Sequence, residues 1–394
     1  MKSSSLYSRQ KGLTLVELMV AVLIGLLAMY AVYMVYEGTE RTKRNIASLG
    51  AAQVDGLYAL FLLEQHIHNA GFGFMRNSPL SLLVGCDAGD VGGNVGGGGL
   101  VTRPLTLRPL PVVIDPNPSL TTLPVGNFDD VYVFFGSSSL NMDPVSVSGV
   151  AGGVTVATPF GFRQNHVLVD TTPPCRAYLV PDNTALINLA APAPRPTSVT
   201  LNLPDTPVAG ADLVDLGIPV RRHFYVNDQN TLLMEDWRLN PDGTWTSAPP
   251  SPIISGVVSF RAQYGIGNLT GALDSVNRPI IGPVNLWTFA TAPWDTAAFQ
   301  VSMTGNAVAQ AQFRQMLRQI KAVRISIIVR ADEPESNSDV AATLPTTFTQ
   351  FADCPGDPSG AACPQTPVTP PALPAGWRYR MYETVIPLKN TIWN

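Results

Sequence analysis

The first part of the chain carries a long run of hydrophobic positions. Residues 13–36 make up 24 positions, and Glu17 is the single charged residue among them. As an α-helix, this run is about 36 Å long, enough to cross a hydrocarbon core of about 30 Å. Its apolar residues occur on every side, which disfavours an amphipathic helix lying on a membrane surface. The pattern therefore predicts a transmembrane helix.

The residues before this run are basic. Residues 1–12 contain Lys2, Arg9 and Lys11 and no acidic residue. A short positive flank stays in the cytoplasm, so we expect the bulk of the chain on the opposite side of the membrane. A cleaved secretory signal peptide has similar parts, but here the hydrophobic run is too long and no small-residue cleavage site follows it.

Glu17 is an unusual residue for a lipid-spanning segment. An ionised carboxylate costs roughly 2.5 to 3.5 kcal/mol at the centre of such a helix. A plain membrane anchor explains the length of the run but leaves the acid without a purpose. An intramembrane acid predicts a positively charged partner.

Gly12 and the "LTLVE" that follows it resemble the processing site of type IV prepilins. In that family a prepilin peptidase cuts after the glycine and methylates the new terminal amine. The resemblance implies cleavage between Gly12 and Leu13, and N-methylation of Leu13, which stands where Phe is commoner. It also implies that Glu17 is an assembly residue, paired in a low-dielectric core with the terminal amine of a neighbouring subunit. Thr14, on the same helical face, would orient that contact.

The helix is predicted to continue as an amphipathic segment over residues 37–70. Its packing stripe has a period near 3.5 and comprises Ile46, Leu49, Gln53, Leu57, Leu60, Glu64 and Ile67. Gly71 predicts the helix end. In pilins the corresponding helix partly unwinds on assembly at a proline that this chain lacks, so the resemblance makes Gly25 the candidate hinge.

The remainder of the chain has the pattern of a β-rich head. "AVRISIIVRA" and "SFRAQYGI" alternate as half-buried strands do, and "DVYVFFG" is apolar on both faces, as in an inner strand. Residues 313–320 have helical spacing, which predicts a short helix packed on the sheet. Turn sequences at 226–231 and 240–245 lie between runs that can pair as hairpins.

These elements predict an α+β, type IV pilin-like fold in which a long N-terminal helix packs on a head with antiparallel sheet. The high Pro and Gly content, 35 and 33 residues, fits many loops. We expect a cytoplasmic leader at residues 1–12, a transmembrane half-helix at 13–36 and an amphipathic half-helix at 37–70. The head follows at 71–394, and 191–217 is the best place in it for a break between two subdomains.

Several internal segments resemble one branch of the pilin family, the PilW-type minor pilins. They are "LLEQHIHNAGFGF", "FDDVYVFFG", "GVVSFRAQYGIG", "IKAVRISIIVRAD" and "YRMYETVIPLKN", in the same order along the chain. The resemblance implies a structural minor pilin of a tip or priming complex, with twitching or adhesion following indirectly. The implied partners are the prepilin peptidase, other minor pilins, the major pilin and a PilY-type tip adhesin. The implied location is the inner membrane before assembly and the cell-surface pilus afterwards.

Two other functions remain open at this stage. A minor pseudopilin of a type II secretion system shares the leader, the helix and the β-rich head. A membrane-anchored ectodomain with its own binding or enzymatic role is the alternative from a different class.

Four cysteines occur in the part of the chain expected to be exported. Outside the cytoplasm, an even number of thiols usually pairs. The short loop between Cys354 and Cys363 favours their pairing, which leaves Cys86 with Cys175. Two other pairings and unpaired buried thiols remain possible, whereas the absence of a Cys-x-x-Cys motif disfavours zinc.

Enzymatic and cofactor motifs are not apparent. His66 and His68 lie two apart on a predicted helix and cannot chelate one metal, and His166 and His223 accompany no catalytic motif. Acidic residues 129–130 and the "ADEPESNSD" loop carry oxygen ligands that calcium could use, but we expect them to be solvated charges in loops. The glycine loop "GDVGGNVGGGGL" lacks the Gly-Lys-Ser/Thr of a phosphate-binding loop. We therefore expect no enzyme activity, no cofactor and no metal.

The net charge is −4, charged residues make up 14% of the chain, and the sequence shows no basic block. We therefore expect no direct binding to nucleic acid.

Overall fold

The structure is a computed structural model that describes part of the chain. This part comprises residues 14–73, 110–116, 127–137, 144–149, 154–156, 161–170, 176–180, 199–201, 210–239, 245–273, 279–290, 293–295, 299, 307–335, 338–352 and 373–389. The predicted leader lies outside it, as do the four cysteines and therefore their predicted disulfides.

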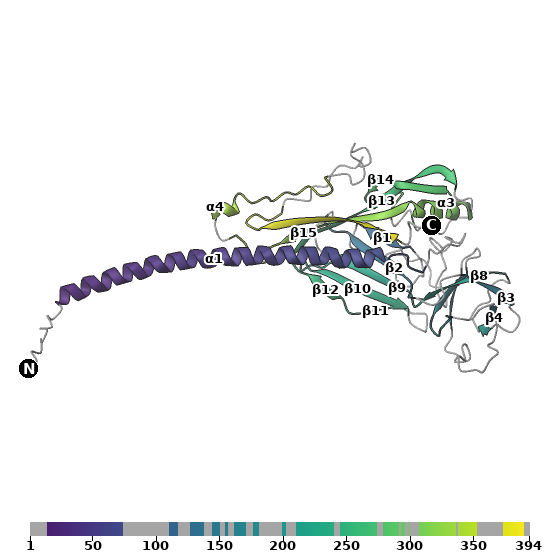
Figure 1. Ribbon diagram of the computed structural model, residues 1–394, viewed down its shortest axis with the longest axis horizontal. Helices are drawn as coiled ribbons and strands as arrows, with labels where there is room; N and C mark the ends of the chain where they lie inside the picture. The colour runs from purple at the N-terminus through teal and green to yellow at the C-terminus, as the bar shows by residue number, and fades with distance from the viewer. Residues whose placement is uncertain are drawn as a thin grey trace, which may run out of the picture.

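A single long helix, α1 (Leu15–His68), begins the described chain and confirms the predicted N-terminal helix. Its first half extends away from the head, and its second half runs along it (Figure 1). Asn69 caps its C-terminus, and Gly71 adopts a left-handed conformation (φ 74°) two residues further on. The helix thus ends slightly before the predicted glycine, which instead turns the chain towards the head, where its N–H donates to the carbonyl of Phe134.

One antiparallel sheet of the head has the order β1-β2-β9-β10-β11, with β12 also paired to β10. The predicted inner strand is β2, which lies between β1 and β9. The predicted turn after β9 is also present, and its Asn230 adopts a left-handed conformation (φ 57°). The strands are β1 (Val112–Asp115), β2 (Asp130–Phe135), β9 (Val220–Val226), β10 (Leu232–Leu239), β11 (Trp245–Ser247) and β12 (Ser251–Ile254).

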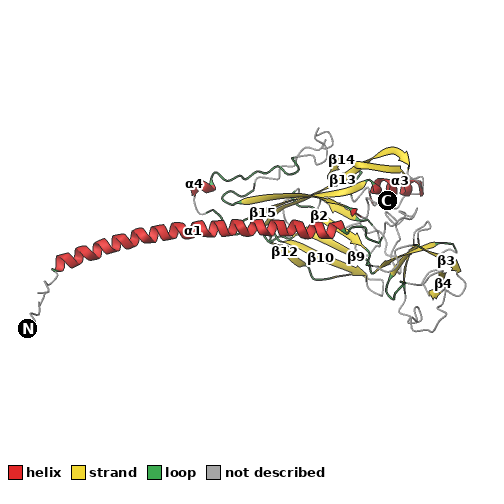
Figure 2. Ribbon diagram, viewed as in Figure 1, coloured by secondary structure: helices red, strands yellow, loops and turns green. Residues whose placement is uncertain are grey.

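A second antiparallel sheet has the order β14-β13-β15-β16. It is accompanied by α3, which confirms the predicted short helix, and by the one-turn α4 (Figure 2). The elements are β13 (Val257–Leu273), β14 (Pro279–Thr288), α3 (Ala307–Arg318), β15 (Ile320–Arg330), α4 (Ser338–Ala341) and β16 (Tyr379–Pro387).

The expectation that β13 and β15 are only half-buried was wrong. Ser259, Arg324 and Ser326, on the face expected to meet solvent, are 0–2% exposed. The side chain of Gln350 lies over this face, where its amide donates to Ser326 and its carbonyl accepts from Ser259. Polar side chains tolerate burial when they are hydrogen-bonded in this way, so a polar alternation does not prove exposure.

A third sheet, of order β6-β5-β8-β3-β4-β7, has its own small hydrophobic core. It is inserted between β2 and β9, and it lies at the end of the head furthest from the start of α1 (Figure 1). The predicted break near 191–217 falls within this insertion and stays a prediction. The strands are β3 (Val145–Gly149), β4 (Val154–Val156), β5 (Val167–Asp170), β6 (Arg176–Leu179), β7 (Val199–Leu201) and β8 (Asp212–Gly217).

The face of α1 that packs on the head is made largely of small side chains. Its buried residues are Ala52, Gly56, Ala59, Leu63 and Ile67. The predicted stripe was wrong in most of its members: Ile46 and Leu57 are 67% and 54% exposed. The physical reason is close approach, since an ideal Cβ on Gly56 would lie 2.2 Å from a ring carbon of Tyr382 on β16.

This close approach makes Gly56 sensitive to substitution. Gly56→Ala should destabilise the protein by about 1–2 kcal/mol, because overpacking outweighs the better helix propensity of alanine. Gly50→Ala is the matched control: no atom lies within 4 Å of a Cβ there, so it should be neutral or stabilise by up to about 1 kcal/mol. Urea unfolding of the detergent-solubilised protein, followed by tryptophan fluorescence, measures both. Equal stability of the two variants would contradict the packing described.

Candidate functional site

The free half of α1 is the first part of the candidate site. Residues 14–39 are all exposed, although most of them are apolar. The helix is long and apolar enough to cross a membrane, and none of its most apolar window is buried against the protein. Such a surface is stable only in contact with lipid or with other proteins.

Thr14 and Glu17 interact at the start of α1 through the side chain of Thr14 and the backbone of Glu17. The N–H of Glu17 donates to Thr14 Oγ1 at 3.3 Å, so the threonine caps the helix. The carboxylate of Glu17 remains at the exposed surface, where a partner can reach it. Gly12 and Leu13 lie outside the described residues, so the predicted cleavage site and the roles of Thr14 and Glu17 in assembly stay predictions.

Gly25 lies within the uninterrupted helix, and no atom is found within 4 Å of a Cβ built there. No other described part of the chain packs against this position. The predicted hinge at Gly25 therefore also stays a prediction.

A second apolar surface, here called the outer row, lies on α1 beside the head. It comprises Ile46, Val54, Leu57, Tyr58 and Phe61, which are 50–67% exposed. At 100° per residue these positions lie on the side of the helix opposite the buried face. The sequence prediction missed the outer row because it expected the large apolar residues of this helix to pack on the head. The alanines and the glycine on the opposite side were the sequence signal for the face that packs.

A polar clasp joins α1 to the head at the first point where the two meet. The Glu335 carboxylate accepts from Asn45 Nδ2 at 2.8 Å and from two nitrogens of Arg378, Nη2 at 2.6 Å and Nε at 2.9 Å. The N–H of Glu333 donates to Ser48 Oγ at 3.2 Å. Because charge-assisted hydrogen bonds are stronger than neutral ones, this clasp fixes where the free half of the helix ends.

A second polar junction lies near the other end of α1. Arg222 on β9 forms two hydrogen bonds with Asp236 on β10, at 2.6 and 2.7 Å. The same guanidinium donates to His66 Nδ1 of α1 at 2.6 Å. Burial, and then the neighbouring positive charge of Arg222, lower the pKa of His66 to about 4. His66 is therefore a neutral acceptor at pH 7.

His223 lies in a buried cluster on the other face of the first sheet. Its ring is stacked between Tyr132 and Tyr225, with centroid distances of 4.1 and 4.4 Å. His223 Nε2 donates to Asp130 Oδ2 at 3.0 Å, and Glu235 Oε2 lies 3.7 Å from Nδ1. Burial lowers the pKa of His223, but its interactions with the Asp130 and Glu235 carboxylates, which accept from the ring, outweigh burial and raise the pKa overall.

The expectation that Asp129 and Asp130 are solvated loop charges was wrong, because both are 1% exposed. Asp129 accepts from the N–H of Ala262 and lies 3.3 Å from Arg261 Nε, which ties the first sheet to the second. Burial raises the pKa of Asp129 to about 7. Each carboxylate has a structural role, and the described residues contain no group of three or more His, Cys, Asp or Glu suited to a metal.

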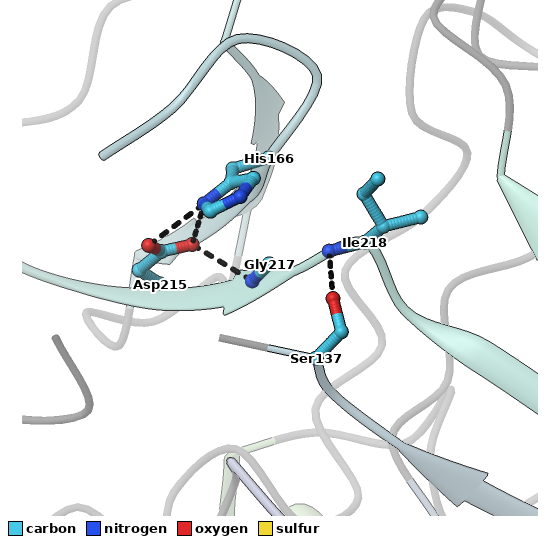
Figure 3. Close-up of polar contacts among 5 residues, drawn as sticks. All are labelled: Ser137, His166, Asp215, Gly217 and Ile218. Carbon is cyan, nitrogen blue, oxygen red and sulfur yellow. Dashed lines mark hydrogen bonds and ion pairs between the residues drawn. The ribbon is translucent and has the colours of Figure 1, made fainter. Parts of the chain in front are cut away.

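His166 and Asp215 form a pair in the third sheet (Figure 3). His166 Nδ1 lies 3.0 and 3.1 Å from the two carboxylate oxygens, and Asp215 also accepts from the N–H of Gly217. Ser137 is turned towards Ile218, whose N–H donates to its hydroxyl at 2.8 Å. These three side chains therefore do not form a Ser-His-Asp triad, which needs the serine on the histidine.

An exposed apolar half-helix joined to a β-rich head defines a pilin-like α+β protein. Residues 7–33 match the prokaryotic N-terminal methylation motif, and residues 223–390 match the family described as Type IV Pilus-assembly protein W. Together these matches support a PilW-type, prepilin-like protein, a minor pilin related to the type IV pilus. No curated protein and no solved structure matches the chain.

The junction at His66 predicts a pH dependence. Because the folded state lowers the pKa of His66, the unfolded state binds more protons between about pH 4 and 6.5. The stabilisation from neutral His66 should be complete above pH 6.5 and lost as the pH falls to 4. His66→Gln keeps an acceptor for Arg222 and should lose less stability on acidification.

Urea unfolding of both proteins at pH 4.5 and 7.5 measures this difference. The comparison with the variant is needed because Asp129 and His223, whose pKa values are raised, contribute with the opposite sign. An equal loss of stability in the two proteins would contradict the assignment to His66.

Proposed function

We propose that this chain is the precursor of a minor pilin that is cleaved between Gly12 and Leu13, methylated on Leu13 and incorporated at the initiating or tip end of a type IV pilus. The match to the methylation motif supports the processing step, and the match to the pilus-assembly family supports the pilus over a secretion system. The prepilin peptidase, other minor pilins, the major pilin and a PilY-type adhesin are the partners that follow.

The observation that carries this proposal is the outer row of α1. Ile46 lies about 15 Å and Phe61 about 37 Å beyond Tyr36, the end of the hydrophobic run, at 1.5 Å per residue. Both are too far from the hydrocarbon core for lipid to cover them when the helix stands upright in the bilayer. Their large exposed side chains therefore need protein, and the helices of neighbouring subunits are partners of matching length and polarity.

The same packing gives Glu17 its partner. In the precursor its carboxylate lies at the cytoplasmic end of the membrane segment, next to the peptide bond that the peptidase cuts. After cleavage, an amine at Leu13 of one subunit can pair with Glu17 of another in the water-poor core of the fibre. Leaving either charge buried and alone costs several kcal/mol, so pairing favours the assembled state.

The size of the head favours a rare or terminal position. Three sheets follow α1, and the third projects at the end of the head furthest from the membrane segment (Figure 1). A head of this size is difficult to repeat at every step of a dense helical fibre, whereas a terminal subunit has room. The proposed role is structural, and adhesion or twitching would follow from the pilus as a whole.

Polar substitutions in the outer row test whether this surface packs against neighbouring subunits. The triple variant Val54→Ser, Leu57→Ser, Phe61→Ser should fold and insert in the membrane, because none of these side chains is buried in the head. It should nevertheless be reduced at least about tenfold in sheared surface pili, as measured by quantitative mass spectrometry. Gln53→Ser, an exposed change on the same helix outside the row, should incorporate normally.

Incorporation of the triple variant at the wild-type level would overturn the proposed role of the outer row. The same measurement counts wild-type copies, and an abundance close to that of the major subunit would overturn the terminal position.

Processing and pairing are tested separately. A Gly12→Val variant should accumulate as an uncut precursor in the membrane, because a branched side chain blocks the peptidase. Glu17→Gln should be cut and methylated normally but lost from pili, since the terminal amine then has no counter-charge. Intact-mass spectrometry of membrane and pilus fractions distinguishes these outcomes. Filaments containing protein that still begins at Met1 would disprove both steps.

A further inference from the structure

The aromatic residues of the free half of α1 are confined to one short band. Between residues 15 and 44 they are all tyrosines, at positions 30, 33 and 36. Each is 59–62% exposed, and the spacing of three places them over adjoining faces of the helix. Aromatic residues used only to pack helices together would be expected along the whole segment.

The position of this band matches the outer surface of a bilayer. Measured from Leu15 at 1.5 Å per residue, Tyr30 lies at about 22 Å and Tyr36 at about 31 Å. The outer boundary of a hydrocarbon core about 30 Å thick falls inside this interval. Tyrosine favours this depth because its ring is apolar and its hydroxyl needs a polar partner.

The chain beyond the band is polar and leads directly to the clasp. Residues 37–44, "EGTERTKR", carry ion pairs between Arg41 and Glu37 and between Lys43 and Glu40. Asn45, the first residue held by the head, lies about 14 Å beyond Tyr36. The headgroup layer on one side of a bilayer is roughly 5 to 8 Å thick, so the head begins just above it.

We infer that Tyr30, Tyr33 and Tyr36 form an interfacial anchor, here called the tyrosine belt, which binds the headgroup region of the outer leaflet and fixes the depth of the precursor. The belt keeps the head clear of the lipid and keeps Glu17 at the opposite, cytoplasmic boundary of the hydrocarbon core. The partner is thus a phospholipid surface. The inference rests on the membrane stage of the proposed function, but not on assembly into a fibre.

Hydrogen–deuterium exchange of the full-length protein in nanodiscs of phosphatidylethanolamine and phosphatidylglycerol tests this inference. In the wild type, slow exchange should extend to Tyr36, and residues 37–44 should exchange at least about tenfold faster. In the triple variant Tyr30→Leu, Tyr33→Leu, Tyr36→Leu the band loses its polar rim and enters the hydrocarbon. The boundary of slow exchange should then move about one helical turn towards Asn45.

Tyr58→Leu is the matched control, because Tyr58 is half-exposed on the same helix but lies beyond the clasp. It should leave the boundary where it is, and unchanged tryptophan fluorescence in each variant verifies the fold of the head. An unchanged boundary in the triple variant would overturn the tyrosine belt. If that variant kept its depth but disappeared from pili, the tyrosines would instead serve contacts between helices, which also overturns the inference.

The proposed function can fail independently of this test. A protein with the expected exchange boundary that never enters a pilus would retain the tyrosine belt and lose the pilin role.

Discussion

The architecture depends on how closely α1 approaches the edge of the second sheet. Gly56 lies against the ring of Tyr382, and the other residues at the centre of this contact are alanines. Small side chains let the helix and strand backbones come together without a thick intervening layer. As a direct consequence, the large apolar residues of the same helix are left on its outer side. The same close packing therefore accounts for both the contact between helix and head and the exposure of the outer row.

Polar contacts then mark how far the contact with the head extends along the helix. The clasp at Asn45 and the junction at His66 lie at the two ends of the helical segment that contacts the head. Each contains a guanidinium already paired with a carboxylate, and Asn45 in the clasp and His66 in the junction each add one hydrogen bond to that ion pair. Because both ion pairs are already formed within the head, the contacts position the helix with little further ordering of the charged side chains. Nothing comparable holds residues 15–44 in the described part of the chain.

The sequence was sufficient for the long apolar helix, the N-terminal methylation motif, the inner strand β2 and the β-rich head, because periodicity and local motifs carry that information. It was not sufficient for the face of α1 that packs. That face depends on Tyr382, which is far away in the sequence, and the choice of Gly56 over Leu57 has no local indication. The burial of Arg324 and Asp130 was missed for the same reason, since their partners Glu383 and His223 are on distant strands.

The free half and the packed half of α1 present apolar surface at different distances along the helix axis, and under the proposed function this difference would give assembly a direction. In the proposed membrane precursor, lipid would cover the segment up to Tyr36, but it would not reach Leu57 or Phe61. In the proposed fibre, a neighbouring helix shifted along its axis would cover both surfaces at once and bring the proposed terminal amine to Glu17. In that proposed transfer from bilayer to fibre, one apolar environment would replace another, while neighbouring subunits would newly cover the outer row. Because burial of apolar surface contributes about 25 cal/mol per Å², that additional area favours the fibre over the isolated precursor.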